Sequence, residues 1–101
     1  MSISIISQSF TLAAATPTPL VPTNPGRKIL RLDVTGVNPA TVKFGVAPAS
    51  ATDGIPFAAA PSVGTPGGNI FLSEGDAPID AIYAYSTLGT TVTVSEGIEY
   101  A

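Results

Sequence analysis

Histidine, cysteine and tryptophan are absent from this 101-residue sequence, and only 11% of its residues are charged. Most catalytic and metal-binding chemistry therefore has no side chain to use. Without cysteine there is also no disulfide framework, so stability must come from packing or from association with other chains. These absences favour a scaffold over an enzyme, and they predict no catalytic residue, no metal site and no cofactor.

Basic residues and long apolar runs are scarce as well. Four Lys and Arg against seven Asp and Glu give a net charge of −3, whereas nucleic-acid binding depends on a surplus of basic side chains. No apolar run approaches the roughly 18 residues that cross a bilayer. We therefore expect neither a nucleic acid nor a membrane as partner.

The sequence is rich in aliphatic and β-branched residues together with 10 Gly and 10 Pro, a composition typical of short strands and many turns. Apolar and polar residues alternate in several short segments, and no segment keeps a helical period. A chain of this length has room for one core. It thus predicts a single all-β domain over residues 1–101, an antiparallel β-sandwich or jelly-roll-like barrel of six to eight short strands.

The amino-terminal segment 1–12 is expected to form a strand or an arm. Its alternation begins at Ile3 and Ile5 and changes phase at Ile6, which indicates a bulge. Ile3 and Ile5 are the candidate residues of an arm that crosses to a neighbouring copy, and the other interpretation is a first strand of the same sandwich. In segment 13–26, four prolines exclude a helix and a central strand and predict an extended connector.

The clearest alternation runs from Arg27 to Gly45 and is interrupted by turn residues around Val37. It predicts an antiparallel hairpin. The register centred on Val37 places Leu30 opposite Phe44 and Leu32 opposite Val42.

The remainder of the chain begins with Gly, Pro and Ala residues that predict a long loop over 46–68, with a short strand near 55–58. Long loops of this kind are often interaction surfaces. Further strands are expected at 69–73, 79–86 and 90–95, with a tight turn at Leu88-Gly89 between the last two.

Charge is polarised along the sequence. The four basic residues fall in the predicted hairpin, and six of the seven acids follow it. In the proposed register Arg31 lies opposite Lys43, which is unfavourable unless an acid relieves the pair. Either Asp33 does so locally, or this face docks on an acidic surface of another subunit. The candidate docking residues are Arg27, Lys28, Arg31 and Lys43.

Two further groups of side chains are candidates for binding. Tyr83 and Tyr85 share one face of a predicted strand and would form an interface patch if exposed. Glu74, Asp76 and Asp80 could hold Ca²⁺ or act as an acid–base pair, but their spacing fits no calcium loop and a solvated turn explains them. A carbohydrate-binding module that uses both tyrosines and the acidic loop is therefore an alternative function.

A longer pattern begins at Asn24-Pro25-Gly26-Arg27-Lys28, which leads into an alternating strand. The order of segments from about Val21 to Gly97 resembles small virion proteins of tailed bacteriophages. The later matching segments are Val42-Lys43-Phe44-Gly45, Gly75-Asp76-Ala77-Pro78, Ala81-Ile82-Tyr83-Ala84 and Thr91-Val92-Thr93-Val94-Ser95-Glu96-Gly97. Each segment is ordinary strand sequence, so the order and spacing carry the resemblance.

This resemblance implies a structural protein of the virion, commonly a decoration or cement protein on the capsid exterior that stabilises the head by bridging capsid subunits. The implied partners are the major capsid protein and copies of the chain itself, as a homo-oligomer on the particle. A tail, neck or fibre-attachment component is the alternative position in the same particle.

Overall fold

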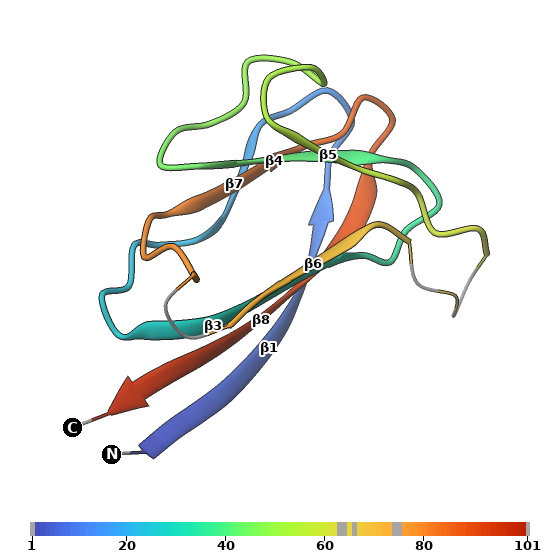
Figure 1. The fold of residues 1–101 in the computed structure, drawn as a ribbon. Helices are drawn as coiled ribbons and strands as arrows, with labels where there is room; N and C mark the ends of the chain where they lie inside the picture. The colour runs from blue at the N-terminus through green and yellow to red at the C-terminus, as the bar shows by residue number, and fades with distance from the viewer. Residues whose placement is uncertain (1, 63–64, 66, 74–75, 101) are drawn as a thin grey trace.

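The computed structural model describes residues 2–62, 65, 67–73 and 76–100, which form eight strands in two four-stranded antiparallel sheets (Figure 1). The first sheet has the order β1 (Ser2–Leu12), β8 (Thr90–Tyr100), β3 (Arg27–Val34), β6 (Asn69–Leu72). The second has the order β2 (Thr18–Val21), β7 (Ile82–Tyr85), β4 (Ala40–Phe44), β5 (Ile55–Phe57). The predicted all-β sandwich is confirmed. In the described part of the chain, no helix is long and apolar enough to cross a membrane.

The core lies between the two sheets and follows from alternation along each strand. In β3, Leu30, Leu32 and Val34 are buried while the residues between them face outward. In β7, Ile82 and Ala84 are buried, so the two tyrosines of this strand lie on its outer face. The buried apolar cluster comprises Leu12, Leu20, Val21, Leu30, Leu32, Val34, Ala40, Val42, Phe57, Ile82, Ala84, Val92 and Val94.

The predicted hairpin centred on Val37 is wrong. β3 pairs with β6 and β8, whereas β4 pairs with β5 and β7, so the two strands lie in different sheets. Leu30 lies opposite Leu72 and Glu96, and Val42 lies opposite Ile55 and Ala84. Alternation shows which face of a strand is apolar but not which strand it pairs with. Two strands with apolar inner faces can pair as a hairpin or lie in opposite sheets of the sandwich.

The connecting loop shows why the chain crosses between the layers. The backbone N–H groups of Thr35 and Gly36 both donate to Thr91 O, at 2.9 and 3.2 Å, and the Asn38 amide donates to Gly89 O at 2.8 Å. A Cβ on Gly36 would lie 2.6 Å from Thr91 N, so only glycine fits against this strand. The loop is held by the start of β8 and does not close on itself.

Other sequence predictions hold in part. The short strand near 55–58 and the strand at 69–73 are present as β5 and β6, and the connector at 13–26 contains an edge strand, β2. β7 is shorter than predicted and β8 is longer. The turn at Leu88-Gly89 joins strands of different sheets. The bulge near Ile5 and Ile6 is wrong, because β1 pairs with β8 in one continuous register from Ser2–Tyr100 to Leu12–Thr90.

Candidate functional site

Arg27, one of the four predicted docking residues, is the largest fully buried side chain among the described residues, with 1% of its surface exposed. Its Nε donates to Glu96 Oε2 at 2.8 Å, and its two terminal nitrogens donate to three backbone carbonyls, those of Pro22, Pro78 and Asp80. The guanidinium therefore joins the connector, β3, β8 and the loop before β7. Arg27 has no exposed surface with which to dock in the isolated chain.

The residues before Arg27 form the turn that places it. The Asn24 side chain accepts the N–H of Gly26 at 2.9 Å, and the Asn24 carbonyl accepts the N–H of Arg27 at 3.1 Å. Asn24 N–H donates in turn to Ile79 O at 2.8 Å. An asparagine that bonds its own backbone two residues on is a common turn device. This part of the phage-like pattern therefore determines the fold at the entry to β3.

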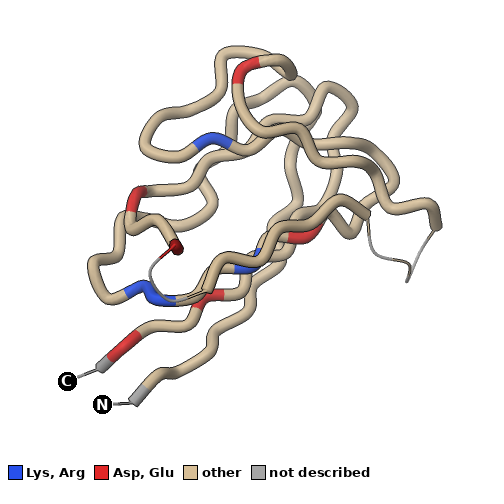
Figure 2. The backbone as a smooth tube through the Cα atoms, in the orientation of Figure 1, with Lys and Arg blue, Asp and Glu red and all other residues tan. Residues whose placement is uncertain are grey.

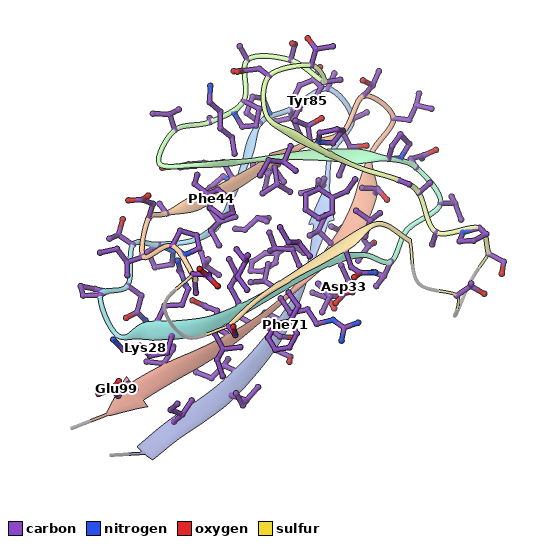
Figure 3. The ribbon with its side chains drawn as sticks, viewed as in Figure 1. Lys28, Asp33, Phe44, Phe71, Tyr85 and Glu99 are labelled. Carbon is purple, nitrogen blue, oxygen red and sulfur yellow. The ribbon has the colours of Figure 1, made fainter. Side chains whose placement is uncertain are left out.

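The other three candidate docking residues each have an acidic partner. The Nζ atom of Lys28 lies 3.8 Å from Oε2 of Glu99, and both residues are labelled in Figure 3. Arg31 bonds Asp33 at 2.9 Å on the outer face of β3. Lys43 bonds Asp53 at 2.7 Å in the second sheet. Arg31 and Lys43 are therefore not opposite one another, and Asp33 does not relieve Lys43 as the hairpin register implied. The charges that are polarised along the sequence therefore form local ion pairs in space, and Figure 2 marks the basic and acidic positions along the backbone.

Asp53 organises the loop between β4 and β5. Its carboxylate accepts a hydrogen bond from the Lys43 ammonium and another, at 2.8 Å, from the backbone N–H of Ala49. These two bonds, the one from Lys43 first, lower the pKa of Asp53 below its ordinary value. The predicted loop at 46–68 is thus fastened to the sandwich at this point.

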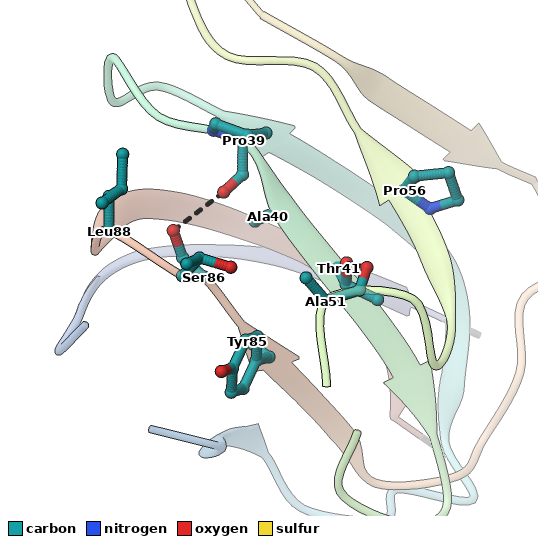
Figure 4. A pocket seen from close by; sticks show the side chains of 9 residues that line it. Pro39, Ala40, Thr41, Ala51, Pro56, Tyr85, Ser86 and Leu88 are labelled. Carbon is teal, nitrogen blue, oxygen red and sulfur yellow. Dashed lines mark hydrogen bonds between the residues drawn. The ribbon is translucent and has the colours of Figure 1, made fainter. Parts of the chain in front are cut away.

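The outer face of the second sheet carries a small pocket beside Tyr85. Its volume is about 300 Å³, and its lining includes Tyr85, Thr41 and the exposed Leu88 (Figure 4). Ser86 closes one side, because its hydroxyl donates to Pro39 O at 2.8 Å. Tyr83 is also half-buried on this face but does not line the pocket. The two tyrosines therefore share the outer face, as the sequence predicted, but only Tyr85 contributes to the pocket.

The structure describes two of the three acidic residues that the sequence suggested as a Ca²⁺ site. Asp76 and Asp80 are exposed, and Glu74 lies outside the described residues. Among the described residues no three acidic side chains lie close enough together to hold a metal ion. Neither acid lines the pocket beside Tyr85.

Residues Ile3–Ser9 of β1 form an exposed segment, named so from here on, that is not covered on either face. All seven residues are exposed, including Ile3 and Ile6 at 39% and Ile5 at 62%. Alternation along a strand normally covers every second residue, so exposure on both faces means that this stretch extends past the core. Figure 1 shows β1 and the end of β8 running together beyond the sandwich toward the two termini.

The sequence pattern predicts Ile3 and Ile5 as arm residues but not Ile6 or Phe71 as exposed apolar residues. Ile6 was assigned to a bulge because it breaks the alternation. In the structure it lies on the opposite face from Ile5 in a regular strand, where neither face is covered. Phe71 on β6 is 62% exposed on the outer side of the first sheet (Figure 3). The phase change was the available signal for Ile6, since a strand outside the core has no apolar face to keep.

Comparisons with known proteins give little guidance. No protein-family model matches the chain, and no curated protein matches it. Among solved structures, a chain from the disulfide-linked pili of Bacillus endospore appendages aligns over 98% of this chain and 93% of its own length, with 16% identity and a TM-score of 0.34. A similarity at this level carries no argument about function.

Proposed function

We propose that this chain is a non-enzymatic structural protein of a tailed-bacteriophage particle, bound to the outside of the capsid as a decoration protein that bridges capsid subunits. The observation that supports a structural role is the exposed segment Ile3–Ser9, an uncharged stretch with three exposed isoleucines that projects from a well-packed sandwich. Exposed apolar patches of this kind mark interaction sites. The particle is suggested by the order of segments from 21 to 97, which resembles that of small phage virion proteins.

The distribution of charge supports the same role. Each of the four basic side chains is within 4.0 Å of an acid of its own chain, so contacts with a partner would fall mainly on neutral surface. Protein interfaces are depleted of charge at their centres. A protein that binds only the assembled shell would stabilise that shell by mass action.

Quantitative mass spectrometry of purified phage particles tests this proposal. We expect the chain in hundreds of copies per particle, in fixed proportion to the major capsid protein. A variant with Ile3→Ser and Ile5→Ser should fold normally and occupy fewer positions, whereas Thr87→Ser, at an exposed position in the turn between β7 and β8, should keep full occupancy. A copy number of a few would place the chain in the tail or neck, and absence from particles would contradict the proposal.

A second candidate is carbohydrate binding, which the pocket beside Tyr85 favours. Its volume of about 300 Å³ is at the small end for ligand sites, and an aromatic ring beside a shallow pocket suits the apolar face of a sugar. In a glycan array, Tyr85→Ala should abolish any binding that the wild type shows, whereas Tyr83→Ala should leave it intact. No binding by the wild type would exclude this candidate.

A further inference from the structure

The four edge strands of the two sheets differ in how they are protected from pairing with another chain. β2 contains Pro19 and is four residues long, β5 contains Pro56 and has three residues, and β6 has four residues. Short edges and proline are the usual protection against edge-to-edge association. β1 has eleven residues without proline, glycine or charge, and Figure 2 shows no charged residue along it. Among the strands that the structure describes, one long edge is therefore left open.

The hydrogen bonds of β8 show which backbone groups of β1 face this open edge. Thr91 O accepts bonds from the loop after β3, and Glu99 N–H donates to Gly26 O just before β3. In a strand, the N–H and C=O of one residue point to the same side and successive residues alternate. Odd-numbered residues of β8 therefore face β3, and even-numbered ones face β1.

The same alternation carries over to β1 through its register. Even residues of β8 lie opposite even residues of β1, as in Gln8–Val94 and Phe10–Val92. The odd-numbered residues Ile3, Ile5, Ser7, Ser9 and Thr11 thus direct their backbone N–H and C=O groups to the open edge. Along Ile3–Ser9 these groups form the regular pattern that accepts an antiparallel strand.

We propose that β1 pairs with β1 of a second copy, antiparallel about a two-fold axis, which joins the two first sheets into one continuous sheet. This inference rests on the proposed assembly role and specifies one partner in it. A strand that pairs with itself brings each charge near its own copy, and β1 carries no charge. Self-pairing is therefore free of the like-charge repulsion that opposes it in most edges.

The exposed segment also sets the register of this pair. Its centre is Ile6, and a two-fold axis at Ile6 uses the whole exposed run, pairing Ile3 with Ser9 and Ser4 with Gln8 of the other copy. The ends that pack on the core, with half-buried Phe10 and buried Leu12, then lie at opposite ends of the pair, which sets the two cores apart. Ile6 meets its counterpart directly, and Ile5 lies diagonal to its counterpart on the other face.

Because the chain has no cysteine, single introduced cysteines report this register directly. Ile6 falls at a non-hydrogen-bonded position, where opposed Cα atoms are about 4.5 Å apart and a disulfide can close. The Ile6→Cys variant should form a covalent dimer under mild oxidation. In the Ser4→Cys variant, a control on the same face, the two thiols are four residues out of register, roughly 13 Å apart, and the chain should stay monomeric. Mixing Ser4→Cys with Gln8→Cys should give a covalent pair.

Charge exchange at Ile5 provides a test without a covalent bond. Ile5→Lys and Ile5→Glu should each weaken self-association about tenfold, because like charges then lie diagonally across the axis. An equal mixture of the two variants should recover it. Light scattering and sedimentation measure the mass of the species in solution. As a control, the Phe71→Lys variant, with its substitution at an exposed residue of β6, should leave self-association unchanged.

The outcomes separate this inference from the proposed function. A wild type that stays monomeric at millimolar concentration, with no cross-link in the Ile6→Cys variant, overturns the pairing. Equal cross-linking of Ser4→Cys and Ile6→Cys overturns it too, since it shows that the contact has no register. A monomer with full occupancy on particles contradicts the pairing alone, whereas a dimer that is absent from particles contradicts the particle role alone.

Discussion

Arg27 and the isoleucines of the exposed segment occupy positions opposite to those expected from their chemistry. The arginine is 1% exposed and is surrounded by carbonyls and a carboxylate, while Ile5 is 62% exposed. Arginine is almost never fully buried unless it is paired. Position relative to the sandwich therefore decides burial in these two regions, and hydrophobicity does not.

The difference assigns a separate role to each region. A buried guanidinium with four donated bonds fixes how the connector, β3, β8 and the loop before β7 meet, so it belongs to the fold. Isoleucines in a strand that extends past the core contribute little to folding, so their apolar surface remains available to a partner. Substitutions in the first region should reduce stability, and substitutions in the second should alter association.

The largest effect is expected from Arg27→Met. It leaves the Glu96 carboxylate buried without its cation, and breaking a buried pair in this way costs about 3–5 kcal/mol of unfolding free energy. Urea unfolding followed by circular dichroism measures the loss. Adding Glu96→Leu should recover a large part of it, because the unpaired charge is then removed. A single variant as stable as the wild type would show that Arg27 does not hold these segments together.

A comparison within β1 should give the next largest effect. Leu12 is 2% exposed in the core, and Leu12→Ala should cost about 2–5 kcal/mol, the usual range for a buried leucine. Ile5→Ala on the same strand should change stability by less than about 0.5 kcal/mol. Both values come from the same unfolding experiment under conditions where the chain is monomeric. Similar losses at the two positions would mean that the exposed segment is covered within its own chain.

The sequence was sufficient for the class of fold because alternation fixes which side chains face inward. Leu30, Leu32 and Val34 alternate with Arg31 and Asp33 in the sequence, which predicts one apolar strand face, and that face is the core. Strand partners could not be predicted in the same way. The loop around Val37 reads as a hairpin turn, and only its bonds to Gly89 and Thr91, some fifty residues later, direct the chain to the other sheet.

The candidate docking residues show a related limit. The sequence grouped the four basic residues in one predicted hairpin, which does not form. No local pattern revealed that Glu96, Glu99 and Asp53 lie beside Arg27, Lys28 and Lys43. Ion pairs between distant segments depend on strand order, which the sequence did not reveal. The exposed segment was more accessible to prediction, because a strand without charge, proline or glycine is visible in the sequence alone.

The smallest expected effect concerns Asp53, whose half-buried ion pair with Lys43 contrasts with the buried Arg27 pair. The hydrogen bonds from Lys43 and from Ala49 N–H hold the pKa of Asp53 below its ordinary value of 3.8 in the folded chain. A carboxyl group whose pKa is lower when folded adds stability above the unfolded pKa and loses it as the pH falls through the folded pKa. The wild type should therefore be slightly more stable than Asp53→Asn at pH 5 to 7, and this difference should shrink below about pH 4. Urea unfolding of both proteins across this range measures it, and in a Lys43→Met background the difference should be smaller at neutral pH. A difference that is independent of pH would mean that the Asp53 carboxylate contributes through loop shape and not through its charge.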